Sequence, residues 1–103
     1  MKMMTKEIER MLPKLYVNDG KPKNEVKVVV KYFDPCGSAT WYITEYDGQD
    51  TMYGYVTGLQ EDEYGYVSYK ELCETKTRFG LGIERDLNWN PNTTLAEAID
   101  KKL

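Results

Sequence analysis

The sequence predicts an α+β fold: a mainly antiparallel sheet of four to five strands with short flanking helices at the N-terminus, after strand four and at the C-terminus. Two observations support this prediction. Apolar and polar residues alternate in several short segments, as they do in half-buried strands, and short polar turns separate these segments. Ser/Thr-x-x-Glu patterns predict helix starts after the fourth strand and near the C-terminus. The sheet is expected to be antiparallel because strands joined by short turns pair in that way.

The first third of the chain is expected to contain one helix and one strand. Thr5 can cap a short helix that runs to about Leu12. Residues 26–33 form the clearest strand, because valines alternate there with Lys27 and Lys31. The polar segment between the two elements is expected to be a loop.

The middle of the chain is expected to form a β-hairpin from residues 39–47 and 50–59, with Gly48 and Gln49 as a two-residue turn. This register sets Glu45 opposite Met52, Ile43 opposite Gly54 and Trp41 opposite Val56. Successive side chains of a strand point to opposite faces, so the register also predicts which residues share a face. One face would carry Trp41, Ile43, Met52 and Val56, with Glu45, Asp47 and Asp50 at the turn end, and the other would carry Tyr42, Thr44, Tyr46, Tyr53, Tyr55, Thr57 and Leu59.

The last third of the chain is expected to alternate between strands and helices. Ser68 and Glu71 form one predicted capping box, and Thr94 and Glu97 form another, so each pair predicts a helix start. The expected elements are a strand at 64–67, a helix at about 69–76, a strand at 83–89 and a short C-terminal helix.

Length and composition limit the classes of protein and of chemistry. The chain has 103 residues and a mass of 12.0 kDa, which predicts a single domain over residues 1–103. It contains no His, which excludes Ser-His-Asp catalysis, Cys-His catalysis and His-ligated zinc. Its two thiols, Cys36 and Cys73, are too few for a four-ligand zinc site. The sequence lacks both a long apolar run and a signal-peptide pattern, so we expect a cytoplasmic protein with no membrane contact.

The charge is unevenly distributed along the chain. The net charge is −3, yet residues 1–33 hold eight Lys and Arg against four acidic residues. Residues 34–103 hold the remaining six basic and thirteen acidic residues. The basic N-terminal third leaves a surface that can attract an anion, whereas the ordinary alternative is that these charges serve solubility.

Acidic residues occur in two groups that suggest a metal site. Glu45, Asp47 and Asp50 surround the predicted hairpin turn, and Glu84 and Asp86 alternate in the predicted fifth strand. If the two groups met, their oxygens could bind Mg²⁺ or Mn²⁺ for phosphodiester hydrolysis, and no cofactor is expected otherwise. The alternative is that these acids are solvated at strand ends. The residues that could then hold the phosphate are Lys27, Lys31 and Arg85.

Tyrosines are the second unusual feature. The chain has nine, and most fall in or beside the second to fourth strands. The segment Tyr53-Gly-Tyr-Val56 recurs as Tyr64-Gly-Tyr-Val67, which suggests two neighbouring strands with similar roles. A tyrosine face can stack single-stranded bases, and it also suits sheet packing or a protein interface. The candidate binding residues are Tyr42, Tyr46, Tyr53 and Tyr55 together with Lys27, Lys31 and Arg85.

Six segments carry a resemblance to a known family: Leu12-Pro-Lys-Leu-Tyr16, Lys31-Tyr-Phe-Asp-Pro35, Trp41-Tyr-Ile-Thr-Glu-Tyr-Asp-Gly48, Tyr53-Gly-Tyr-Val-Thr-Gly-Leu59, Glu63-Tyr-Gly-Tyr-Val-Ser-Tyr-Lys-Glu-Leu72 and Phe79-Gly-Leu-Gly-Ile-Glu-Arg-Asp-Leu87. The chain resembles the domain-of-unknown-function family 2958 from about Met4 to Glu97, with Gly82 where Pro is usual. The resemblance implies a setting in plasmids, phages or integrative conjugative elements. Some members carry a single-stranded-DNA endonuclease label, but the resemblance supplies no catalytic residues.

Together these features favour a mobile-element accessory protein that binds a protein or single-stranded DNA through a tyrosine-rich sheet face. The alternative is a metal-dependent single-stranded DNA endonuclease that uses the acidic residues. A homo-oligomeric scaffold is a third hypothesis, because aromatic faces are also typical of interfaces. The sequence does not decide whether the protein is an enzyme, nor its oligomeric state.

Overall fold

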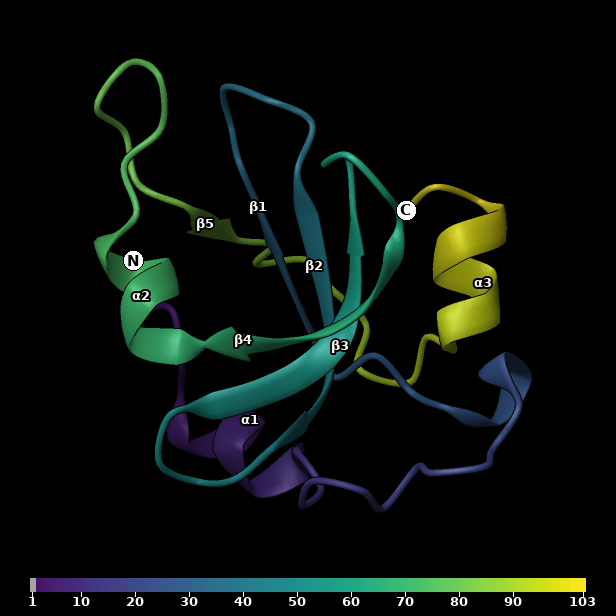
Figure 1. Ribbon diagram of the computed structural model, residues 1–103. Helices are drawn as coiled ribbons and strands as arrows, with labels where there is room; N and C mark the ends of the chain where they lie inside the picture. The colour runs from purple at the N-terminus through teal and green to yellow at the C-terminus, as the bar shows by residue number, and fades with distance from the viewer. Residues whose placement is uncertain (1) are drawn as a thin grey trace.

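The computed structural model describes residues 2–103 and contains a five-stranded antiparallel sheet flanked by short helices (Figure 1). The elements in chain order are α1 (Lys6–Met11), η1 (Lys23–Glu25), β1 (Val30–Phe33), β2 (Thr40–Tyr46), β3 (Thr51–Thr57), β4 (Glu63–Ser68), α2 (Tyr69–Glu74), β5 (Glu84–Arg85) and α3 (Leu95–Asp100). The strands lie in the order β4-β3-β2-β1-β5, and every neighbouring pair is antiparallel. The predicted α+β class and the positions of its three short helices are confirmed.

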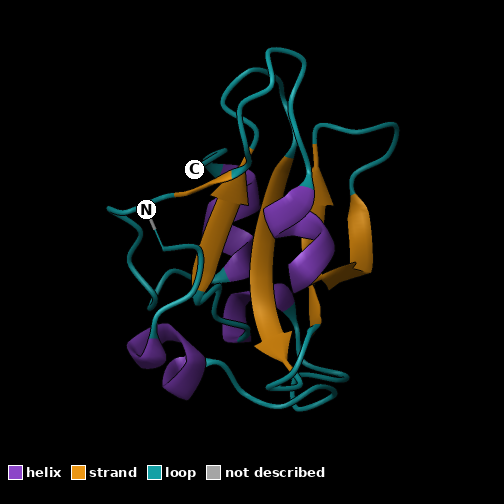
Figure 2. Ribbon diagram, turned by 90° about the vertical axis from the view of Figure 1, so that its left-hand side faces the viewer, coloured by secondary structure: helices purple, strands orange, loops and turns teal. Residues whose placement is uncertain are grey.

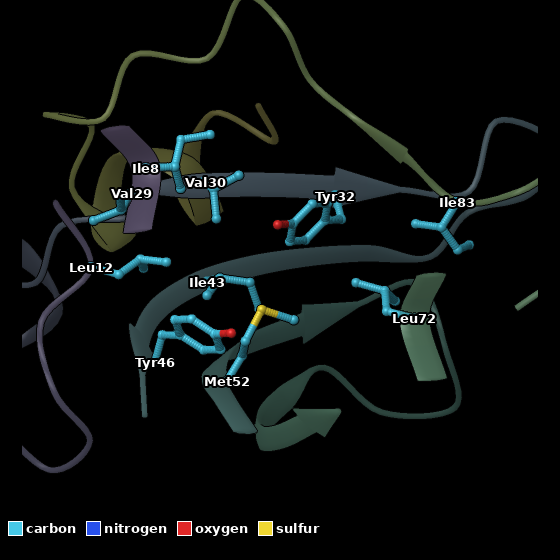
Figure 3. Packing of buried hydrophobic residues seen from close by; sticks show 10 residues of the cluster. All are labelled: Ile8, Leu12, Val29, Val30, Tyr32, Ile43, Tyr46, Met52, Leu72 and Ile83. Carbon is cyan, nitrogen blue, oxygen red and sulfur yellow. The ribbon is translucent and has the colours of Figure 1, made fainter. Parts of the chain in front are cut away.

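Helices pack on both faces of the sheet, with α1 and α2 on one face and α3 on the other (Figures 1 and 2). The larger hydrophobic cluster lies between the sheet and the first two helices (Figure 3). The smaller cluster lies under α3, where Leu95 and Ala98 contact Val28 and Tyr42. Each large side chain buried in these clusters contributes about 1.5–3 kcal/mol, so both faces depend on their helices for stability. The labelled residues of the larger cluster are Ile8, Leu12, Val29, Val30, Tyr32, Ile43, Tyr46, Met52, Leu72 and Ile83.

The β2–β3 hairpin confirms part of the predicted register and corrects the rest. Ile43 lies opposite Gly54 as predicted, and so does Trp41 opposite Val56. A β-bulge at Thr44 then shifts the pairing by one residue. The prediction that Glu45 lies opposite Met52 is therefore wrong. The observed partners beyond the bulge are Glu45 with Tyr53 and Tyr46 with Met52.

The shift arises because the hairpin turn is longer than the predicted pair Gly48 and Gln49. Asp47 pairs with Thr51 through a backbone hydrogen bond of 2.9 Å, so three residues lie between them. The Asp47 carboxylate holds this turn by accepting hydrogen bonds from the backbone N–H groups of residues 49, 50 and 51. The bulge offsets the extra turn residue, which is why the register farther along the strands matches the prediction. The bulge also moves Glu45 to the face of Tyr53, and Tyr46 to the face of Met52.

Two predicted strands are shorter than expected. Only Val30–Phe33 of the segment 26–33 belongs to β1. Residues 26–28 run beside residues 93–95 instead, where the Val28 N–H donates to the Thr93 carbonyl at 2.8 Å. Of the segment 83–89, only Glu84–Arg85 pairs with β1, because the Asp86 carboxylate caps a turn by accepting the Asn88 N–H. Because β5 has only two residues, it pairs with only Tyr32 and Phe33 of β1.

The helix starts follow the predicted capping residues. Thr5 caps α1, and its hydroxyl accepts the Ile8 N–H. Thr94 and Glu97 form the complete capping box of α3. Ser68 caps α2, but its hydroxyl donates to Asp50, and the reciprocal half of the predicted box is not formed.

Two further observations concern membranes and thiols. Between residues 2 and 103, no helix has the length and apolar character that crossing a membrane would need. Cys36 and Cys73 are both free, and Cys73 is exposed on α2.

The bulged hairpin requires a glycine at position 54, and this requirement can be tested. A Cβ on Gly54 would lie 2.0 Å from the Tyr42 carbonyl oxygen, which is backbone and cannot move aside. We expect Gly54→Ala to lower the free energy of unfolding by about 1–3 kcal/mol or more. Gly65 pairs with Gly54 across β3 and β4 but has open space around it, so Gly65→Ala is the matched control. Urea denaturation of both variants measures the effect, and equal stabilities would contradict the register.

Candidate tyrosine face and acidic pocket

One side of the β3–β4 pair carries a continuous group of aromatic side chains. We call this group the tyrosine face, and its members are Tyr16, Tyr53, Tyr55, Tyr64 and Tyr66. Tyr53 pairs with Tyr66 across the two strands, and Tyr55 pairs with Tyr64, so the rings lie on one side of the sheet. The repeated Tyr-Gly-Tyr-Val segment thus forms two neighbouring strands, as predicted.

The rings of the tyrosine face contact one another closely. The centroids of Tyr53 and Tyr66 lie 5.0 Å apart, and those of Tyr55 and Tyr64 lie 5.1 Å apart. Tyr53 and Tyr64 are parallel, with centroids 5.8 Å apart. Contacts of this kind stabilise a pair by about 0.5–1.5 kcal/mol beyond burial. The rings are therefore held in place before any partner arrives.

The outer part of the tyrosine face remains open to solvent. Tyr16 is 62% exposed and Tyr66 is 59% exposed, whereas Tyr64 is 40% exposed. The neighbouring Tyr16 side chain raises the pKa of Tyr66. The Lys23 ammonium lies 5.3 Å from the Tyr55 ring centroid and 5.9 Å from that of Tyr64. The face therefore combines exposed phenol groups with rings that already attract a cation.

Two of the four tyrosines predicted for binding lie in the interior. Tyr42 is buried beside Trp89, and its hydroxyl donates to the Leu103 carbonyl at 2.5 Å. Tyr46 is buried in the larger cluster, because the bulge turns it toward Met52 and Tyr69. The prediction that Tyr46 shares a face with Tyr53 and Tyr55 is therefore wrong.

The predicted basic residues lie near β1 and β5, at the edge of the sheet opposite β4. Lys31 forms an ion pair with Asp86 at 3.8 Å. The Lys27 ammonium donates to Asn92, and Arg85 donates to the Lys2 carbonyl. β2 and β3 separate the strand of Lys31 from Tyr64 and Tyr66 on β4. These three basic side chains therefore do not belong to the tyrosine face.

The structure does not bring the two acidic groups together. Asp47 and Asp50 lie at the β2–β3 turn, whereas Glu84 belongs to β5, which β1 separates from β2. Each group has its own partners, since Asp86 pairs with Lys31 and Asp50 accepts hydrogen bonds from Ser68 and Lys70. Within residues 2–103, no three His, Cys, Asp or Glu side chains are grouped so as to hold a metal ion.

Glu45 lies apart from the other acids in the interior. The side chain is only 2% exposed, and its Oε1 accepts the Tyr16 N–H at 2.5 Å. It lines a pocket of about 180 Å³ between the loop at residues 18–21 and the sheet. We call this cavity the Glu45 pocket, and its other lining residues include Asp19, Lys21, Thr44, Tyr53 and Tyr64.

A larger groove of about 670 Å³ lies on the opposite side of β4. Its floor includes Trp41, Val67 and Leu72, which are apolar. Its rim includes Glu61 and Glu63, and no Lys or Arg is among its lining residues. The surroundings of the β4 edge are therefore acidic rather than basic.

The sequence predicts that Tyr53 and Tyr55 share a face, which the structure shows, but the predicted set does not include Tyr16, Tyr64 or Tyr66. The repeat of Tyr-Gly-Tyr-Val was the available signal for Tyr64 and Tyr66. No local pattern identifies Tyr16, because the backbone hydrogen bond to Glu45 that anchors its loop spans 29 residues.

Comparison with known proteins identifies one family. A family model described as "Protein of unknown function (DUF2958)" matches residues 3–102, which is nearly the whole chain. No curated protein matches the chain, and no solved structure does either.

The hydrogen bonds at the hairpin turn predict acid sensitivity. Hydrogen bonds from Ser68 and from the Lys70 N–H hold the pKa of Asp50 below its ordinary value of 3.8. A lowered pKa in the folded state means that the stabilisation is complete above pH 3.8 and is lost as the pH falls below that value. We expect Asp50→Asn to lower the melting temperature at neutral pH and to have little effect well below pH 3.8. Glu74→Gln, at the exposed end of α2, is the control, and an Asp50→Asn effect that is independent of pH would contradict this account.

Proposed function

The chain belongs to the DUF2958 family, and we propose that it is a non-enzymatic binding module of a mobile genetic element whose tyrosine face contacts a protein partner. The observation that carries the proposal is the set of prearranged aromatic rings whose outer members, Tyr16 and Tyr66, remain more than half exposed. Tyr is enriched in protein interfaces because it combines a large apolar ring with a hydroxyl. The mobile-element setting follows from the family resemblance of the sequence.

The charge near the tyrosine face favours a protein over a nucleic acid. Proteins that bind single strands combine stacking rings with a positively charged groove that follows the phosphates. Here Lys21 and Lys23 lie near the rings, but Asp19 lies there too, and Glu61, Asp62 and Glu63 immediately precede Tyr64. This mixed charge gives little net attraction for phosphate.

The position of β4 adds a second argument for a protein partner. Among residues 2–103, β4 pairs only with β3, so one side of its backbone has no strand of the described chain beside it. A partner that reaches this edge can combine backbone hydrogen bonds with contacts to Tyr64 and Tyr66. Such a partner would bury the most exposed rings of the face.

A site-specific crosslink tests this proposal directly. The photoreactive residue p-benzoylphenylalanine replaces Tyr66 in one protein and Phe79 in another, because Phe79 is 69% exposed and lies outside the tyrosine face. We expect a discrete protein adduct from position 66 and none from position 79. Mass spectrometry identifies the adduct, and the purified partner is then titrated by calorimetry.

In that titration, Tyr66→Ala and Tyr16→Ala are expected to weaken binding by about 10-fold or more, as interface tyrosines often do. Phe79→Ala is expected to bind as the unchanged chain does. Fluorescence anisotropy with a labelled oligo-dT strand measures the nucleic-acid alternative. Tight oligo-dT binding that both tyrosine variants abolish would replace the protein partner with single-stranded DNA, and unchanged partner binding in both variants would refute the role of the face.

A further inference from the structure

The carboxylate of Glu45 is buried beside the tyrosine face. Its Oε1 accepts the Tyr16 N–H, but within residues 2–103 its Oε2 has no hydrogen-bond donor and no Lys or Arg at ion-pair distance. Oε2 is not completely buried. Among the described residues, Thr77 Oγ1 is the side-chain atom that is both fully buried and without a hydrogen-bond partner, and Glu45 Oε2 is not in that class. At 2% exposure the Glu45 carboxylate keeps little contact with water, and such a charge is costly unless it is paired. Glu45 thus lines the Glu45 pocket with a carboxylate of which one oxygen has no partner among the described residues.

The walls of the pocket favour a positively charged group. Tyr53 and Tyr64 contribute aromatic rings, and Asp19 contributes a second carboxylate. Burial raises the pKa of Tyr53, and the negative charges of Glu45 and Asp19 raise it further, so both acids act on the same wall of the pocket. The Lys23 ammonium near the Tyr64 ring, outside the pocket lining, shows that such a ring attracts a cation in this protein.

The size of the pocket selects one side chain rather than a small-molecule ligand. Its volume of about 180 Å³ lies below the roughly 300–1,000 Å³ of ordinary ligand pockets. Because only one Glu45 oxygen is unpaired, the Glu45 carboxylate does not offer the two free acceptors that a guanidinium fork matches best. A compact ammonium group needs no such pair.

We propose that the Glu45 pocket receives the ammonium end of a lysine side chain presented by the protein partner. This inference rests on the proposed function, because the pocket shares Tyr53 and Tyr64 with the tyrosine face. The ammonium donates to Glu45 Oε2 and lies against the two rings. Lys21 also lines the pocket, and its positive charge opposes the incoming group.

The test uses a small probe, so it does not depend on finding the partner. n-Butylammonium chloride is titrated into the ¹⁵N-labelled chain and followed by NMR, with sodium chloride and n-butanol as matched controls. We expect saturable shifts of the amides of residues 18–21, 44, 45 and 53 with the ammonium alone. n-Butylguanidinium is expected to bind more weakly, and tighter guanidinium binding would overturn the choice of lysine.

Three variants then identify the groups responsible. Glu45→Gln keeps an oxygen for the Tyr16 N–H but removes the charge, and we expect the probe to bind about 10-fold or more weakly. Lys21→Ala is expected to strengthen binding, because it removes an opposing charge. Asp100→Asn, at the end of α3, removes a charge far along the chain and is the control. Saturable binding that Glu45→Gln leaves unchanged would refute the inference, as would the absence of any saturable shift.

The outcome separates the two proposals. Tyr66 does not line the pocket but contacts its wall residue Tyr53, so the two proposals are separated by measuring partner binding and probe binding in both Tyr66→Ala and Glu45→Gln. Probe binding without a protein partner would refute the proposed function alone. Partner binding that depends on Tyr66 but not on Glu45, together with no probe binding, would refute the lysine pocket alone.

Discussion

The β-bulge at Thr44 is the constraint on which the surface chemistry of this protein depends. Asp47 holds a turn that is one residue longer than the shortest hairpin turn, and the bulge restores the register beyond it. The restored register allows the tight approach of Gly54 to the Tyr42 backbone. Because of the bulge, Glu45 and Tyr46 each lie on the face opposite to the one that strict alternation predicts. Tyr46 enters the core, and Glu45 becomes a buried carboxylate beside the tyrosines.

This arrangement divides the second face of the sheet into two parts with different roles. α3 covers the part near Tyr42, where Leu95 and Ala98 complete a hydrophobic cluster. Within residues 2–103, no α-helix packs on the part over β3 and β4, where Lys23 at the start of η1 lies over the rings. Rigid rings, an open edge strand and a charged pocket therefore occur together. Recognition of a protein surface draws on all three, whereas phosphate recognition would need a basic groove that this face lacks.

The sequence predicted those parts of the fold that depend on local signals. Thr5, Ser68 and Thr94 each marked a helix start, and alternating valines and tyrosines marked the strands. The errors share one physical cause, since they depend on contacts between distant residues. Val28 was predicted to belong to the first strand but lies outside β1, because its N–H donates to the Thr93 carbonyl. Whether the acids of β2–β3 and β5 meet, which the sequence left open, also depends on the strand order, and β1 lies between β2 and β5. The role of Tyr16 depends on a hydrogen bond to Glu45, which only the folded chain forms.

The most direct test of the account is the solution register around Thr44, measured by NMR from nuclear Overhauser contacts between β2 and β3. The account predicts contacts of the Tyr46 ring with Met52 and of Glu45 with Tyr53, together with proximity of Glu45 to the Tyr16 amide. Contacts of Glu45 with Met52, and a Tyr46 ring on the side of Tyr53 and Tyr55, would mean an unbulged hairpin. That result would remove the buried carboxylate from the tyrosine face and contradict the account.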